Sequence, residues 1–298
     1  MADNSEKYFV KWCNFILKPR KLKIESISKD FNDGIKLVAL LEELSGTKCD
    51  KRLSEPKNDI FKLSNLSIAM DMAKKMVKTL MVNGQNFIHG TDTDIKLILG
   101  FIFDLVLHYQ VDDIDMDGKH GKEGLLMWCQ KTTAGHAHVD VQNFASSWLD
   151  GMAFLALVHA YNPACVDYDA EAAAFEAEKD LPKPQRIEKA KARMNKAFKL
   201  IGEQMEVEEI LDDDFAEMPS DKANITYLSL IFKAFSQAKM KNKYQQVIGR
   251  MIAKAQKMQD LKDQLAEKTK EFNADLAQAN ENLAKADPET IEEIQKRI

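Results

Sequence analysis

Two long apolar runs of this chain begin in the same way. Residues 31–46 read FNDGIKLVALLEELSG, and residues 148–163 read WLDGMAFLALVHAYNP. In each run an aromatic residue and a spacer precede Asp-Gly, and the positions that follow are apolar on nearly all sides, which is typical of a helix buried inside a bundle. Aspartate can cap the first free N–H groups of a helix, and glycine permits a tight entry. We therefore predict that each Asp-Gly pair opens a buried helix.

The two runs indicate a duplicated unit. When Asp33-Gly34 is aligned with Asp150-Gly151, other parts of the two copies also match. Each copy has a Trp-Cys pair upstream and further apolar segments downstream. The second copy is the longer one. Its additional residues fall in the stretch 169–186, which is rich in Ala, Glu, Lys and Pro and is predicted to be a loop.

Helix start signals support an all-α fold. Thr91 to Asp94 is predicted to cap a helix that continues through Tyr109, and Pro219-Ser220-Asp221 marks the equivalent start in the second copy. The predicted organisation is a first helical domain, a polar linker, a second helical domain, and a helical neck with the start of a rod: residues 5–112, 113–121, 122–238 and 239–298.

The last region has heptad spacing, which predicts a coiled coil or a spectrin-like helix. Its 4-3-4-3 pattern begins at Tyr244, Ile248, Met251, Ala255 and Met258. Asp287-Pro288-Glu289 resembles a cap with proline at the first helical position, so a second helix is predicted to begin there.

Composition narrows the function classes. The chain has 298 residues, 45% apolar and 30% charged, with a net charge of −5. That charge argues against bulk nucleic-acid binding, which usually requires a basic domain. The N-terminus has no apolar signal-peptide core. The four cysteines form no CxxC pair, so we expect reduced thiols in a cytoplasmic protein.

Catalytic and cofactor chemistry has little support in the sequence. The histidines are scattered outside any HExxH or nucleophile motif, and no glycine-rich phosphate loop is present. His159, inside an apolar run, is interpreted as a satisfied core histidine. The segment from Asp115 lacks the later ligands of an EF-hand calcium loop, because position twelve is Leu126. We expect no enzyme activity, no cofactor and no metal.

These features resemble the tandem calponin-homology domains of the actin-binding head of alpha-actinin and its relatives. The resemblance covers roughly residues 5–238. It rests on Phe9-x-x-Trp12-x-Asn14 and the first Asp-Gly run, and on the second-copy stretch from GLLMWCQKTT to VDYDA. It implies an all-helical fold with four main helices per domain, binding to filamentous actin, and cross-linking if the rod forms a homodimer. It also implies a location at the actin cytoskeleton.

The residues also favour an acidic and partly apolar partner. Residues 7–23 contain six basic side chains and no acidic one, interleaved with aromatic residues. Phe9, Trp12 and Ile16 have helical spacing, so we predict that they form a core stripe and that the basic side chains face outward. In the family, the first helix, the helix 94–109 and the first helix of the second copy form the actin-binding surface. The resemblance therefore implies these contact residues: Lys7, Lys11, Lys18, Lys96, Phe103, Leu107 and Lys131.

Two departures from the family bear on regulation. Phe103 stands where close relatives have Trp, and a weaker cation–π partner would loosen the closed arrangement of the two domains. Where relatives place lysines associated with phosphoinositides, this chain has Gly135, His136, His138 and Leu149. We therefore doubt phosphoinositide binding, and expect any such binding to require protonated His136 and His138.

The sequence leaves one intramolecular contact and two other functions open. The acidic stretch 203–217 is either a solvated loop or a partner for a basic segment such as 239–257. Instead of binding actin, the chain could be a calponin-homology scaffold for microtubules or signalling partners. A small-molecule enzyme is the other alternative, and it lacks a clustered set of polar groups.

Overall fold

The computed structural model describes residues 5–51, 53, 55–285 and 293–298. The chain divides into two compact units, residues 1–236 and 237–298. Within the described residues, the only strands are β1 (Asp115–Met116) and β2 (Lys119–His120), which form an antiparallel hairpin. The fold is all-α, as predicted.

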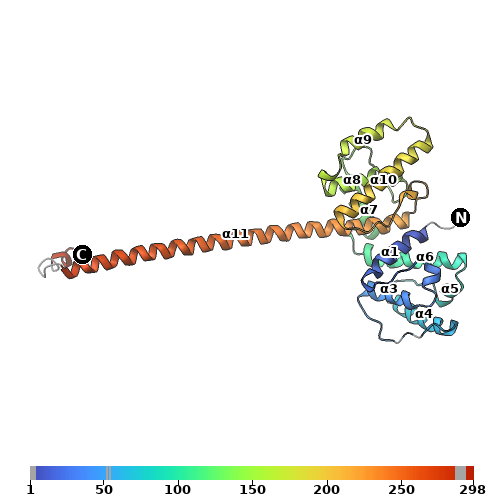
Figure 1. The fold of residues 1–298 in the computed structure, drawn as a ribbon, viewed down its shortest axis with the longest axis horizontal. Helices are drawn as coiled ribbons and strands as arrows, with labels where there is room; N and C mark the ends of the chain where they lie inside the picture. Colours follow the sequence, from blue (N-terminus) through green and yellow to red (C-terminus); the bar gives the residue numbers. More distant parts are fainter. Residues whose placement is uncertain (1–4, 52, 54, 286–292) are drawn as a thin grey trace. The chain divides into compact units, whose positions relative to one another are not determined.

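The first half of unit 1 is a bundle of helices around an aromatic and aliphatic core (Figure 1). Trp12, Phe31 and Phe87 are fully buried in it. Its elements are α1 (Ser5–Leu17), η1 (Lys18–Arg20), α2 (Ile27–Asp30), α3 (Ile35–Ser45), α4 (Asp59–Ala73), α5 (Gly84–His89), α6 (Asp92–Val106) and the π-helix η2 (Leu107–Val111).

The second half of unit 1 is another bundle of helices (Figure 1). Trp148 and Phe154 are fully buried in its core. Its elements are α7 (Gly121–Thr133), η3 (Ser146–Trp148), α8 (Met152–Tyr161), η4 (Pro163–Cys165), α9 (Tyr168–Ala177), α10 (Lys183–Met205), η5 (Asp213–Ala216) and the first turns of α11 (Asp221–Lys285).

Both Asp-Gly pairs open a buried helix, as predicted. Asp33 and Asp150 each accept a hydrogen bond at 2.9 Å from the backbone N–H two residues later. Gly34 and Gly151 are left-handed, with φ of 78° and 79°. A Cβ on Gly34 would lie 2.9 Å from the backbone of Asn65. Glycine is therefore required at Gly34 both for its conformation and for the close helix packing.

The predicted helix starts are also confirmed. Thr91 and Asp94 form a capping box at α6, and Ser220 accepts a hydrogen bond from Ala223 N–H at the start of α11. The apolar helix after Thr91 ends as α-helix at Val106 and continues as η2, so helical structure does pass through Tyr109.

The prediction of a loop at 169–186 was wrong. Residues 169–177 lie in α9, where the side chain of Asp167 accepts a hydrogen bond from Ala170 N–H, and residues 183–186 begin α10. Alanine and glutamate are strong helix formers, and here their propensity outweighs the surrounding polar composition. The predicted cap at 287–289 lies outside the described residues.

The linker contains an ordered hairpin that packs on the second domain. β1 and β2 both contact α7. A Cβ on Gly124 would lie 2.5 Å from the carbonyl oxygen of Lys119 and 2.8 Å from that of Ile114. Gly118 N–H donates to Asp115 Oδ1 at 3.1 Å, which closes the turn. The hairpin therefore belongs structurally to the second domain.

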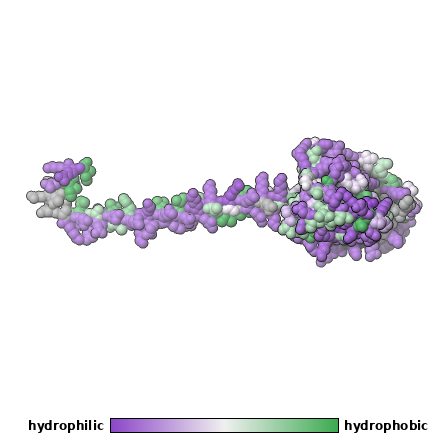
Figure 2. Space-filling view, turned by 90° about the horizontal axis from the view of Figure 1, so that it is seen from above, coloured by the Kyte–Doolittle hydropathy of each residue, from purple (hydrophilic) through white to green (hydrophobic). Residues whose placement is uncertain are grey.

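In unit 2, helix α11 presents an apolar stripe to solvent. Apolar side chains recur along this helix among hydrophilic ones (Figure 2). Those at the heptad positions are about half exposed or more: Tyr244, Ile248, Met251, Met258, Leu261, Leu265, Phe272, Leu276 and Leu283. Among the described helices, none is long and apolar enough to cross a membrane.

Candidate functional site

Helix α1 has one face in the core and one basic face. Of the predicted core stripe, Phe9 and Trp12 are fully buried and Ile16 is half-buried, and Tyr8 is fully buried beside them. Lys7 and Lys11 lie on the outer side and are partly exposed. Lys18 follows at the start of η1 and is largely exposed. The core stripe thus fixes the direction in which the three lysines point.

These three lysines bind carboxylates of the second domain. Lys7 Nζ lies 2.8 Å from Asp212 Oδ1 and 2.6 Å from Asp214 Oδ2. Lys11 Nζ lies 3.7 Å from Asp212 Oδ2, and Lys18 Nζ lies 3.2 Å from Glu208 Oε2. The residues before α11 therefore cover the basic face of α1 with acidic groups.

The charges at this contact are mutually stabilised. Burial alone would lower the pKa of Lys7, but hydrogen bonds to Asp212 and Asp214 outweigh it and hold that pKa above its usual range. The hydrogen bond from Lys7 lowers the pKa of Asp214. At pH values above the ordinary aspartate pKa, this lowered pKa contributes its full stabilisation to the contact. The stabilisation is lost as the pH falls through the lowered pKa.

The acidic stretch 203–217 has ion-pair partners within unit 1. The sequence left open a solvated loop or a basic partner such as 239–257, and within unit 1 the ion pairs join the stretch to α1, η1 and α10. On α10, Lys199 pairs with Glu203 and Lys191 with Glu217. The sequence showed the excess of carboxylates but could not identify lysines about 200 positions away.

Helix α6 contributes an aromatic contact beside this face. The rings of Phe9 and Phe103 lie 6.3 Å apart, and Phe103 is only 7% exposed. Lys222 of the second domain lies over the ring of Phe103, with Nζ 5.6 Å from its centroid. Burial raises the pKa of the nearby Asp104 carboxyl, and the positive charge of Lys222 offsets only part of this rise. A lysine that the sequence did not single out therefore bridges the two domains.

The other candidate residues are distributed over three elements. Lys96 is exposed near the start of α6, and Leu107 is half-buried at the start of η2. Lys131 lies on α7 and forms an ion pair with Asp117 in the turn of the linker hairpin. Four of the seven candidates contact charged groups across the domain boundary, namely Lys7, Lys11, Lys18 and Phe103.

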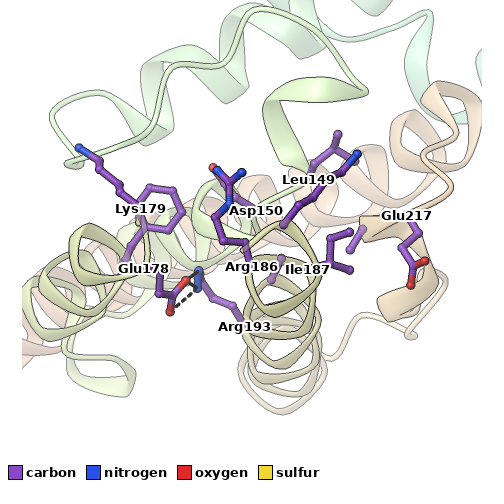
Figure 3. Close-up of a pocket in the computed structure, with 12 residues that line it drawn as sticks. Leu149, Asp150, Glu178, Lys179, Arg186, Ile187, Arg193 and Glu217 are labelled. Carbon is purple, nitrogen blue, oxygen red and sulfur yellow. Dashed lines mark hydrogen bonds and ion pairs between the residues drawn. The ribbon is translucent and has the colours of Figure 1, made fainter. Parts of the chain in front are cut away.

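The positions associated with phosphoinositides in relatives are not basic here. Leu149 lines a cavity of about 650 Å³ whose floor holds the ion pair of Arg193 and Glu178, 2.7 Å apart (Figure 3). His138 Nε2 lies 3.3 Å from Glu176 Oε2, and His136 Nε2 lies 3.0 Å from His159 Nδ1. Both imidazoles at these positions thus already have protein partners.

Comparison with known proteins assigns the family. The calponin homology (CH) domain matches residues 3–111 and again 119–237. The chain belongs to the calponin homology domain family. The two matches, in this order, account for the duplicated helical units.

Relatives with similar sequences include alpha-actinins. The chain is 35% identical over 262 residues to alpha-actinin-4 of Pongo abelii. This alignment covers 86% of this chain and 26% of that protein. It is 36% identical over 239 residues to human alpha-actinin-1. This alignment covers 78% of this chain and 24% of that protein. The chain thus spans about a quarter of the length of these relatives.

A solved structure shares the fold. The actin-crosslinking core of Schizosaccharomyces pombe fimbrin superposes with a TM-score of 0.59 at 18% identity, covering 78% of this chain and 50% of that one. At this identity the likeness supports the tandem CH fold alone.

Proposed function

We propose that this protein binds filamentous actin through its tandem CH domains and is not an enzyme. The observation that carries the proposal is the basic face of α1, where Lys7, Lys11 and Lys18 point outward from an aromatic core stripe. A filament surface with negative charge and apolar patches would suit these lysines and the neighbouring end of α6. The alpha-actinin names of the relatives support the same function and a place in the cytoplasmic actin cytoskeleton.

The acidic stretch would control access to this face. Asp212, Asp214 and Glu208 hold the lysines that we assign to the filament. Filament binding through Lys7 therefore requires that these ion pairs break, so the closed arrangement competes with actin. The contact of Lys222 with the ring of Phe103 also stabilises the closed arrangement. Binding should consequently be moderate in strength.

Filament co-sedimentation tests the assigned surface. The triple variant Lys7→Glu, Lys11→Glu, Lys18→Glu should pellet much less with filaments than the wild-type chain. The matched control reverses three exposed lysines elsewhere in the first domain, namely Lys48, Lys57 and Lys78. Circular dichroism must show both variants folded. Equal loss in both variants would mean that only net charge matters, and pelleting with microtubules instead would favour the alternative scaffold function.

We further propose that unit 2 pairs two copies of the chain, so that two heads cross-link filaments. The apolar stripe of α11 has the heptad spacing of a coiled-coil seam. Residues 239–257 hold six basic and no acidic side chains, whereas residues 258–285 hold six acidic and four basic ones. An antiparallel pair places each basic half beside the other copy's more acidic half, which charge complementarity favours.

Sedimentation equilibrium tests the pairing. The full chain should approach the mass of a dimer as its concentration rises. The variant Met251→Glu, Leu265→Glu, in the stripe, should remain monomeric. The control variant Gln256→Glu, Gln278→Glu, off the stripe, should still dimerise. Low-speed pelleting of filaments, which reports bundling, should follow the dimer; a monomeric wild-type chain would overturn this part of the proposal.

A further inference from the structure

A cavity in the second domain contains two imidazoles in direct contact. It has a volume of about 770 Å³ and is lined by the loop after α7, the end of α8 and the start of α9. His136 Nε2 lies 3.0 Å from His159 Nδ1, and the two rings are nearly perpendicular, at 86°. Both side chains are half-buried, so they are ordered but can be reached from the cavity.

The hydrogen bonds fix which nitrogen atoms carry protons. His136 Nδ1 lies 3.1 Å from the carbonyl oxygen of Thr133. A carbonyl oxygen can only accept, so Nδ1 of His136 donates and its Nε2 has a free lone pair when the ring is neutral. That lone pair is directed at His159. Metal-ligating histidines usually donate their other N–H to a backbone carbonyl or a carboxylate in this way.

We propose that His136 and His159 form a binding site for a divalent transition-metal ion such as Zn²⁺. Imidazole nitrogen binds Zn²⁺ at about 2.0 to 2.1 Å, so two nitrogens on one tetrahedral ion lie about 3.3 Å apart. The observed separation of 3.0 Å is that of a hydrogen bond, so both rings must turn apart for their nitrogen lone pairs to converge on one ion. On metal binding, His159 moves its proton from Nδ1 to Nε2, and no net proton is released from the neutral pair.

Water would complete the coordination, and two carboxylates lie farther away in the cavity. Asp167 and Asp169 line the same cavity. Asp167 caps α9 with one oxygen, which leaves its second oxygen for other partners. Among the described residues, the one group of three clustered potential ligands is Asp212–Asp214, so no third ligand lies within 4.8 Å of both imidazoles. The site is therefore expected to be weaker than a structural zinc site with four protein ligands.

Calorimetric titration of the full chain with ZnCl₂, in a non-coordinating buffer at neutral pH, tests the proposal. The wild-type chain should bind Zn²⁺ saturably, and His136→Gln and His159→Gln should each weaken binding at least tenfold. The glutamine amide can still donate to the Thr133 carbonyl, so His136→Gln should keep the local fold. His120→Gln is the matched control, because His120 is exposed in the linker hairpin; its affinity should equal that of the wild type.

Two further measurements separate metal binding from folding and from thiol chemistry. Zn²⁺ should raise the thermal midpoint of the wild-type chain but not that of His136→Gln, with each protein compared only with itself. Co²⁺ should give visible ligand-field bands without a sulfur charge-transfer band. Absence of saturable binding, unchanged affinity in both glutamine variants, or a sulfur band that disappears in Cys49→Ser would overturn the proposal.

Discussion

Removing the carboxylates that hold Lys7 should strengthen filament binding. The perturbation is the double variant Asp212→Asn, Asp214→Asn, which keeps hydrogen-bond acceptors but removes two negative charges. The side chains of Lys7, Asp212 and Asp214 are 30%, 28% and 49% exposed, so solvent screens the ion pairs only in part. Ion pairs of this kind contribute about 0.2 to 1 kcal/mol each. The variant removes three of them, because Asp212 also pairs with Lys11, and their loss should destabilise the closed contact by about 1 kcal/mol in total.

The expected change in affinity follows from this energy. About 1.4 kcal/mol corresponds to a factor of ten, so about 1 kcal/mol raises the ratio of open to closed molecules about fivefold. The apparent dissociation constant equals the intrinsic one divided by the fraction of competent molecules. If the closed arrangement dominates, high-speed co-sedimentation should therefore show an apparent Kd about fivefold lower.

The control separates this release from a general loss of negative charge. Glu203→Gln, Glu217→Gln removes two charges from the same acidic stretch, but these carboxylates pair with α10 and not with α1. A variant that is merely less repelled by an acidic filament would improve equally in both cases. Equal Kd values for the two double variants, or no change in either, would refute the competition between the acidic stretch and actin.

Three smaller predictions follow from the same structure. Gly34→Ala should lower the free energy of unfolding by about 3 kcal/mol, because it adds both left-handed strain and overpacking. Gly46→Ala, with φ 65° but open space around it, should lower that free energy by only about 1 kcal/mol. Chemical denaturation measures both. Fully buried Cys13, whose pKa burial raises, should resist thiol reagents until unfolding, while half-buried Cys49 reacts in the native protein. Lys222→Met should loosen the contact with the first domain by about 0.5 to 1 kcal/mol and improve filament pelleting two- to fivefold.

Local features of this protein were predictable from the sequence. The Asp-Gly helix entries, the capping box at Thr91 and the core stripe of α1 depend on residues within a few positions of one another. Helical periodicity and capping chemistry are short-range, so a single sequence carries them. The duplication was equally visible, because both copies keep the same buried helix after Asp-Gly. The one clear error, at 169–186, came from reading polar composition as a loop despite strong helix formers.

Long-range pairing needed the tertiary structure. The ion pairs of Lys7 join residues more than 200 positions apart, and many other lysines of the chain were equally plausible partners for the acidic stretch. Likewise, nothing in the spacing of His136 and His159 indicates that the loop after α7 folds back onto α8. Charge patterns show that a group needs a counterpart, but only the packing of the bundles decides which counterpart is brought within bonding distance.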